Sequence, residues 1–368
     1  MPVTANFTQR LFHEYFPPPR FLEMPAVGLT ISDDAVSAIE LVRRRDAYAV
    51  GRFGRRPLLK ESIMGGYVND KDAVVGELRK LKNELKLDFV NASLSEEKAY
   101  LFQTSIPKVS YKEIRSALEF KLEENVPIPA QEAVFDYTIL EGVGHGNEDH
   151  LDIGVTVLPK KVVETYTELL ETVGLLPLSF EIEAQAISRA VIRKGDRGTY
   201  LLVNFGENKT GLFIVSGEVV RFTSTVAIGG EHITKAIAKF LSVSAEEAVR
   251  IKHAQAAVAD KKNMDLFLSL MNALSALKDE INKLSIYWHT HKSEGGESGP
   301  RITKKILCGR DAAFPGFADF LSPVLQNGVE VGNVWSNTSS LDEYIPPIPF
   351  GESLDYAAAV GVALPKGH

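Results

Sequence analysis

The sequence predicts an α/β protein of two related lobes, with a small α/β subdomain inserted in the first lobe. Two observations support this prediction. A strand–turn–strand pattern occurs as AVGLTISDDAVSAIELV from residue 26 and again as YLLVNFGENKTGLFIVS from residue 200. Between these copies lies a self-contained series of alternating strands and helices. One repetition at wide separation indicates two lobes rather than a stack of short repeats.

Length and composition agree with a multidomain globular protein. The 368 residues exceed what one hydrophobic core usually accommodates. A formal net charge of −7 argues against a nucleic-acid partner, because such proteins generally carry a basic surface. The single cysteine, Cys308, cannot form an internal disulfide, and it fits a reducing cytoplasm. No stretch reaches the roughly 20 apolar residues that span a bilayer.

The first copy of the pattern reads as strands at residues 26–31 and 36–42, joined by the polar turn Ser32-Asp33-Asp34. Residues 72–87 then predict an amphipathic helix, because apolar side chains recur along one stripe. The inserted subdomain follows, with a strand, a helix, two strands and a second helix. These elements are expected at residues 98–106, 110–125, 133–140, 151–158 and 160–173.

The second lobe begins with the repeated unit and then becomes mainly helical. A helix at 183–191 precedes three strands, and several amphipathic helices follow, one of them long and running from Leu270 to Trp288. The remaining elements are expected at residues 200–205, 210–215, 218–225, 231–241, 304–309 and 356–364, with further helices starting near Ser244 and Phe317.

These elements predict six segments of chain. They are an N-terminal amphipathic segment with a proline linker (1–25), a first part of the first lobe (26–92), the inserted subdomain (93–175), a second part of the first lobe (176–198), a second lobe (199–345, with a helical subdomain at about 229–300) and a return to the first lobe (346–368).

The N-terminal segment carries aromatic residues at helical spacing before three prolines end any helix. Two interpretations remain open, a short helix that packs on the protein itself or is loosely ordered, and a helix that binds a membrane surface or a partner. Few basic residues flank it, which is weak for attraction to anionic lipids. The residues concerned are Phe7, Leu11, Phe12, Tyr15 and Phe16.

The segments described above resemble the PilM family of type IV pilus assembly proteins, which belongs to the actin-like ATPase superfamily and is related to FtsA. The resemblance extends from about residue 26 to 364. It is carried by AVGLTISDDAVSAIEL, EIEAQAISRAV, the long segment LLVNFGENKTGLFIVSGEVVRFTSTVAIGGEHITKAIAKFL, ILCGRDAAFPGFADFL and YAAAVGVAL. It implies an actin-like fold, with ATP and magnesium as cofactors in a cleft between the lobes.

The resemblance also implies which positions would line that cleft. The candidates for nucleotide binding are Ser32, Asn204, Gly206, Asn208, Thr210, Gly229, Gly230, Lys252 and Gly309. Glu183 matches a position that orients the attacking water in active relatives, although a carboxylate at a helix start is also favoured by the helix dipole. For Gly229 and Gly230 a simple chain reversal, and for Lys252 a solvated helix lysine, remain alternatives. No metal ligand is assigned.

Several residues depart from the pattern that the resemblance requires. Thr30 and Asn204 stand where aspartates would hold magnesium, and Val249 replaces a ribose-contacting glutamate. Asp33 and Asp34 occupy the first phosphate turn, where charges about 4 Å apart repel by about 4 kcal/mol at an effective dielectric near 20. For a bound phosphate that repulsion approaches a thousandfold loss of affinity, unless the aspartates turn away or magnesium shields them. Arg310 and Asp311, which follow Gly309, are expected to crowd the adenine. These departures argue against hydrolysis and, less strongly, against ATP binding.

The resemblance implies a cytoplasmic scaffold at the inner face of the cytoplasmic membrane. Its expected partners are the short N-terminal tail of a PilN-like membrane protein and other pilus proteins, with membrane association through that partner. The tail would lie extended between the first lobe and the inserted subdomain. The alternatives are an ATP-hydrolysing switch or sugar kinase, and an FtsA-like cell-division protein. The losses at Thr30 and Asn204 count against the enzymes, and the ending ALPKGH lacks the membrane helix expected of FtsA.

Overall fold

The structure is a computed structural model that describes residues 27–44, 47–140, 150–255, 264–290, 299–325, 328–340 and 342–365. The predicted N-terminal segment lies outside the described residues, as do most of the glycine-rich loop at 142–150 and of the linker at 293–300. None of the helices in the described part is long and apolar enough to cross a membrane.

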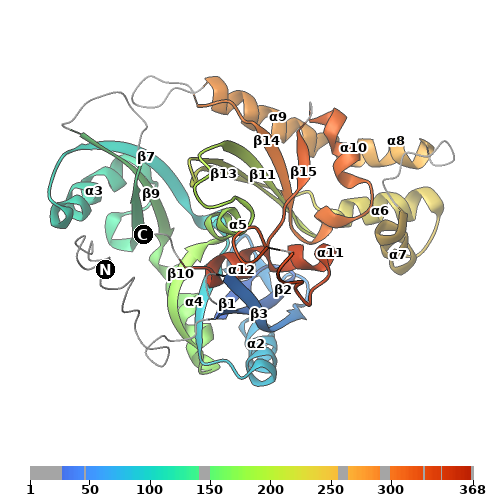
Figure 1. Ribbon diagram of the computed structural model, residues 1–368, viewed down its shortest axis with the longest axis horizontal. Helices are drawn as coiled ribbons and strands as arrows, with labels where there is room; N and C mark the ends of the chain where they lie inside the picture. Colours follow the sequence, from blue (N-terminus) through green and yellow to red (C-terminus); the bar gives the residue numbers. More distant parts are fainter. Residues whose placement is uncertain are drawn as a thin grey trace.

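The first lobe is built on a five-stranded sheet of order β10-β6-β1-β2-β3 (Figure 1). The buried strand β1 pairs antiparallel with β2 and parallel with β6. The helices α2 and α4 contribute their apolar sides to the core of this lobe. The bounds are β1 Val27–Ile31, β2 Ala35–Arg44, β3 Ala47–Pro57, α2 Lys71–Leu85, β6 Phe89–Leu94, α4 Lys160–Thr172 and β10 Leu176–Ile182, with a small hairpin of β4 Ile63–Met64 and β5 Tyr67–Val68.

The second lobe repeats this arrangement with a sheet of order β13-β12-β11-β14-β15. As in the first lobe, the central strand pairs antiparallel with the next strand of the chain and parallel with a later one. The predicted pair of related lobes in an α/β fold is therefore confirmed. The strands are β11 Thr199–Phe205, β12 Thr210–Ser216, β13 Val219–Val226, β14 Lys304–Cys308 and β15 Val329–Val331.

The inserted subdomain has a three-stranded sheet of order β7-β9-β8 and one helix, α3. Its core is separate, because buried side chains of α3 pack with those of the three strands and not with the lobes. We predicted the insertion to span 93–175. The separate core lies within residues 100–159, and the following helix α4 packs into the first lobe instead. The bounds are β7 Tyr100–Pro107, α3 Tyr111–Asn125, β8 Ala133–Ile139 and β9 His150–Pro159.

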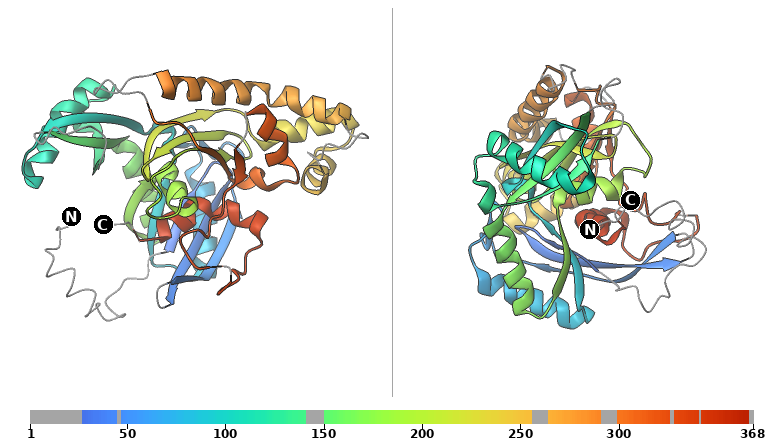
Figure 2. Two further views of the ribbon diagram at one scale, coloured as in Figure 1. Left: turned by 45° about the horizontal axis from the view of Figure 1, so that its top comes forward. Right: turned by 90° about the vertical axis from the view of Figure 1, so that its left-hand side faces the viewer.

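Helices extend the second lobe away from the inserted subdomain, so the two lie at opposite ends of the molecule (Figure 2). The single helix predicted from Leu270 to Trp288 is divided at Leu274 into α8 and α9. The bounds are α6 Gly230–Leu241, α7 Ala245–Gln255, α8 Met264–Ala273, α9 Ser275–Thr290 and α10 Phe317–Val324. Short 3-10 helices are η2 Glu96–Lys98, η3 Ala130–Glu132, η5 Arg310–Ala313 and η6 Leu354–Tyr356.

Two helices occupy the centre of the molecule, between the sheets of the two lobes (Figure 1). They are α5 (Glu183–Val191) and α12 (Ala357–Ala363), which follows the short α11 (Phe350–Ser353) near the end of the chain. Glycine permits their close packing. A Cβ at Gly361 would lie 1.8 Å from the carbonyl oxygen of Ala186 in α5, and one at Gly28 in β1 would lie 1.9 Å from that of Ala359. The end of the chain thus completes the first lobe.

Candidate functional site in the cleft between the lobes

The turn between β1 and β2 forms the first-lobe side of the cleft. The hydroxyl of Ser32 donates to Asp34 Oδ1 at 2.6 Å, and the Ser32 amide donates to the carbonyl oxygen of Ala35 at 2.9 Å. This amide therefore points into its own turn and not into the cleft. Thr30, at the end of β1, is buried and accepts a hydrogen bond from the Ser93 hydroxyl at 3.0 Å. The turn is closed by its own hydrogen bonds.

The turn between β11 and β12 forms the opposite side. The Gly206 amide donates to the Lys209 carbonyl oxygen at 3.0 Å, and the Gly230 amide donates to the Gly206 carbonyl oxygen at 2.9 Å. Thr210 is fully buried, and its hydroxyl donates to the Ile228 carbonyl oxygen at 2.6 Å. Gly229 begins α6 close against this turn, where a Cβ would lie 2.5 Å from the Glu207 carbonyl oxygen. These backbone donors are already used within the second lobe.

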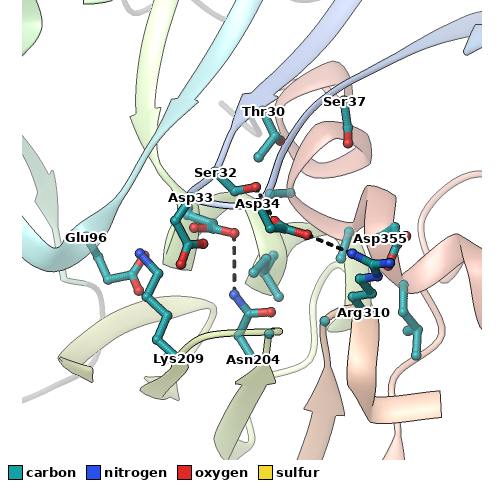
Figure 3. A pocket seen from close by; sticks show the side chains of 18 of the residues that line it. Thr30, Ser32, Asp33, Asp34, Ser37, Glu96, Asn204, Lys209, Arg310 and Asp355 are labelled. Atoms are coloured by element: carbon teal, nitrogen blue, oxygen red, sulfur yellow. Dashed lines mark hydrogen bonds and ion pairs between the residues drawn. The ribbon is translucent and has the colours of Figure 1, made fainter. Parts of the chain in front are cut away.

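Arg310 connects the two sides of the cleft. It follows Gly309, whose φ of +88° and proximity to Asn204 leave no room for a side chain. The Arg310 guanidinium lies 3.4 Å from Asp34 Oδ2 in the first lobe (Figure 3). It also lies 2.8 Å from Glu207 Oε2 in the second lobe. Asp34 is also ion-paired with Arg55 of β3. Arg310 thus points across the cleft between the lobes. From the sequence, its side chain was expected to crowd the adenine of a bound nucleotide.

Lys209 makes a second connection across the cleft. Its ammonium lies 2.8 Å from Glu97 Oε2 and beside Glu96 (Figure 3). Burial alone would lower the pKa of Lys209, but the carboxylates of Asp33, Glu97 and Glu183 raise that pKa overall. Burial raises the pKa of Glu96, and the Lys209 charge only partly offsets this effect. The single ammonium of Lys209 therefore provides the positive charge beside a group of buried or half-buried carboxylates.

Glu183 lies at the floor of this group, at the start of α5. Burial and the nearby Glu96 raise the pKa of Glu183 to about 8, although Lys209 opposes the shift. Asn204 Nδ2 donates to Glu183 Oε1 at 3.4 Å across the lobes. Asn208 Nδ2 donates to Asp33 Oδ2 at 3.3 Å, which is a further contact across the cleft. A carboxyl that keeps its proton near neutral pH is a poor ligand for magnesium.

The space left between these groups is small. The cavity holds about 70 Å³, whereas pockets for ligands of drug size usually hold roughly 300–1,000 Å³. A neighbouring cavity of about 250 Å³ lies over α7 and is lined by Lys252, Val249 and Asp311. Lys252 is buried and its ammonium lies 2.7 Å from Asp311 Oδ1. The interpretation of Lys252 as a solvated lysine is therefore wrong.

Most of the candidate residues from the sequence lie around the first cavity. Five of them line it, namely Ser32, Glu183, Asn204, Gly206 and Gly309. Asn208, Thr210, Gly229 and Gly230 support its second-lobe side, and Lys252 lines the neighbouring cavity. Gly230 also makes room for Asp311, because a Cβ would lie 1.9 Å from Asp311 Oδ2.

Sequence reasoning named Asp34 and Arg310 but missed Lys209, Glu96, Glu97 and Asp355. Lys209 stands between two candidates, Asn208 and Thr210. A lysine in a turn that is expected to bind phosphate was therefore a signal from which Lys209 could have been predicted as a cleft residue. Glu96 and Glu97 follow β6, a strand that the sequence analysis did not predict. Asp355 lines the cavity from near the end of the chain, and burial raises its pKa to about 6.

Two lobes of the same topology, with a cleft between them and two turns that face each other across it, define the actin-like fold. Solved structures support this class. Ethanolamine utilization protein EutJ from Carboxydothermus hydrogenoformans is 14% identical, with a TM-score of 0.52 over 95% of this chain and 90% of that one. MreB5 of Spiroplasma citri bound to ADP is 12% identical, with a TM-score of 0.52 over 85% of this chain and 93% of that one.

The chain belongs to the family of type IV pilus assembly protein PilM, whose model matches residues 28–366. The structure of a PilM–PilN type IV pilus biogenesis complex is also similar, with 21% identity and a TM-score of 0.73 over 92% of this chain and 98% of that one. A search of curated proteins gave no match. The resemblance inferred from the sequence is confirmed.

The family implies a magnesium nucleotide, and the residues present do not fit one in this arrangement. Phosphates would meet the carboxylates of Asp33 and Asp34, and they would have to displace the guanidinium of Arg310. The amides of Ser32, Gly206 and Gly230, which would have to face phosphates, donate to carbonyl oxygens.

Proposed function

We propose that this protein is a cytoplasmic scaffold of a type IV pilus machine that works without ATP. It would lie at the inner face of the cytoplasmic membrane, held there by the N-terminal tail of a PilN-like membrane protein. Membership of the PilM family supports the role in pilus assembly. The observation that carries the nucleotide-free part is Arg310, which lies between Asp34 and Glu207 in the cleft.

The exposed edge of the first-lobe sheet supports a place for the partner tail. Among the described residues β10 pairs only with β6, and β10 lies on the side of the first lobe that faces the inserted subdomain (Figure 1). Leu176 and Leu178 on β10 are 52% and 42% exposed. An extended peptide can add a strand to such an edge, with its apolar side chains on these leucines. We place the tail along β10.

A titration with a synthetic tail of the PilN-like protein from the same organism tests this proposal. We expect saturable binding to the natural protein and at least tenfold weaker binding to Leu176→Lys, because a charge would replace an apolar contact. The matched control is Leu268→Lys on α8, where the leucine is 53% exposed in the second lobe. Equal affinity for all three proteins would contradict the site, and no binding to the natural protein would contradict the partner.

Calorimetry with near-millimolar ATP, with and without magnesium, tests the nucleotide-free part. We expect no binding heat for the natural protein. We also expect none for the double variant Thr30→Asp, Asn204→Asp, because restored aspartates leave Arg310 and Lys209 in place. Tight magnesium-dependent binding to the natural protein would instead support a nucleotide-driven switch.

A further inference from the structure

Most charges on the two sides of the cleft are opposite in sign, although Arg55 of the first lobe pairs with Asp34 and Glu207 of the second lobe lies 2.8 Å from Arg310. The second lobe presents two cations to it, Lys209 from the β11–β12 turn and Arg310 from η5. The first lobe presents carboxylates from three separate segments, which are the β1–β2 turn, the residues after β6 and η6. They are Asp33, Asp34, Glu96, Glu97 and Asp355.

These charges meet in direct contacts between the lobes. Lys209 Nζ lies 2.8 Å from Glu97 Oε2, and Arg310 Nη1 lies 3.4 Å from Asp34 Oδ2. The outer rim carries a third pair, in which Lys60 Nζ lies 2.7 Å from Glu231 Oε1. We call these three pairs the interlobe ion pairs.

Two of the interlobe ion pairs, Lys209 with Glu97 and Arg310 with Asp34, are the inner pairs, and salt screens them less than the pair at the rim. The side chains of Lys209 and Glu97 are 19% and 17% exposed, and those of Asp34 and Arg310 are 18% and 38% exposed. By contrast the Lys60 side chain at the rim is 71% exposed. Partly buried pairs are screened less than surface pairs, and breaking one leaves an uncompensated charge out of water. The inner pairs should therefore dominate the attraction between the lobes.

We infer that Lys209 and Arg310 are built-in cations that hold the two lobes closed in the place where the family implies a magnesium nucleotide. The carboxylates of the first lobe supply the negative charge that the phosphates of a nucleotide would bring, and Lys209 and Arg310 supply the positive charge. The closed arrangement is then a property of the chain itself. This inference rests on the nucleotide-free part of the proposed function but not on the partner tail.

Distance measurements between spin labels on the two lobes test this inference. Labels at Lys80→Cys on α2 and Lys283→Cys on α9 would sit on side chains that are 62% and 71% exposed. The natural cysteine, Cys308, is buried and stays unlabelled. The full chain is measured with its natural cleft and then with Lys209→Met, Arg310→Met or both.

We expect one narrow distance distribution for the natural cleft, unchanged by magnesium ATP. Each single variant should broaden it toward longer distances, and the double variant should do so most. Lys304→Met is the matched control, because it removes a pair with Glu330 inside the second lobe, at 3.1 Å, and should keep the natural distribution. Circular dichroism on each variant verifies that both lobes are folded.

Two outcomes would overturn the inference, and they differ in what else they contradict. If the variants keep the natural distribution and ATP has no effect, the ion pairs do not hold the lobes closed, while the proposed function stands. If magnesium ATP shortens or narrows the distribution of the natural protein, the nucleotide closes the cleft and the nucleotide-free scaffold fails as well. Should Lys209→Met not fold, Arg310→Met alone decides, because the Arg310 side chain is 38% exposed and tolerates replacement better.

Discussion

The β1–β2 turn and the β11–β12 turn are the same element in two lobes, and the same backbone hydrogen bond closes both, from the Ser32 amide to the Ala35 carbonyl oxygen and from the Gly206 amide to that of Lys209. Other interactions differ, because the first turn has no glycine and adds the hydroxyl of Ser32, which donates to Asp34. The second packs backbone on backbone, with Gly206 and Gly229 in close approach. The first carries two aspartates, and the second carries Glu207 and Lys209. The repeated unit has thus diverged, so that an acidic first turn faces a second turn whose lysine reaches across the cleft to Glu97.

Filling the space beside Gly229 should have the largest effect on this pair of turns. A Cβ there would lie within 2.6 Å of the carbonyl oxygens of Gly206 and Glu207, which are backbone atoms that cannot turn away. We expect Gly229→Ala to lower the free energy of unfolding by about 2–3 kcal/mol, as overpacking does. Urea denaturation measures it. The control is Gly217→Ala in the next turn, where no heavy atom lies within 4 Å and only the φ of +61° opposes the change. Equal losses would show that close approach is not the cause.

Removing the charge of Lys209 should cost somewhat less. Loss of one partner from a buried ion pair costs roughly 3–5 kcal/mol, and we expect about 2 kcal/mol for Lys209→Met because the pair is partly exposed. Thermal unfolding at low and high salt measures it. Lys304→Met, which breaks a surface pair, should change stability by less than about 0.5 kcal/mol. A Lys209→Met protein as stable as the natural one would indicate that Glu97 and its neighbours need no counter-charge.

Glu183 should make stability depend on pH. Burial raises its pKa from the usual 4.5 to about 8, so the folded protein keeps a proton that the unfolded chain releases. Stability from this group is then fully present below about pH 4.5 and is lost as pH rises toward 8. Glu183→Gln removes the loss and should be more stable at pH 8 by on the order of 1–2 kcal/mol. Denaturation at pH 5 and pH 8 measures the difference, and Glu246→Gln on the surface of α7 is the control. A difference that does not grow with pH would contradict the assignment.

The smallest effect is expected from Ser32, which closes the first turn. Ser32→Ala removes hydrogen bonds to Asp34 and Ala35 but leaves Asp34 paired with Arg55. We expect a loss of about 0.5–1 kcal/mol, which is typical of one intramolecular hydrogen bond. Chemical denaturation measures this loss too. A loss as large as that of Gly229→Ala would show that the Ser32 hydroxyl matters as much to the first turn as close backbone packing does to the second.

Strands with a clear apolar pattern were predicted from the sequence, and these include the edge strands β7, β8 and β13. Three other edge strands, β3, β10 and β15, were not predicted. The two copies of the repeat were found because β1, β11 and β12 are buried almost throughout. The strand β3 lies at an edge, and its glycines and arginines hide any alternation. At the opposite edge, Pro177 and two exposed leucines conceal β10. Exposure on one side removes the apolar signal on which such predictions depend.

The site shows the same limit in another form. The candidate residues were implied by the resemblance to the PilM family, and most of them lie around one cavity. Their ion pairs join residues far apart in the chain, such as Lys209 with Glu97 and Arg310 with Asp34. The pairing of Lys252 with Asp311 is also distant in sequence, so a helix lysine was interpreted as solvated. Only the folded arrangement of the lobes decides these partners.

The packing of α12 has a consequence for synthesis of the protein. The first lobe contains the earliest described residues, but its core also needs Ala357–Ala363, which pack against β1 and α5. While the ribosome is still adding the second lobe, the cleft side of β1 lacks this cover. Domains that close early in the chain can fold during translation, whereas this lobe must wait for its last helix. Emergence of α12 from the ribosome, rather than emergence of the first sheet, should therefore set when the first lobe becomes resistant to proteolysis.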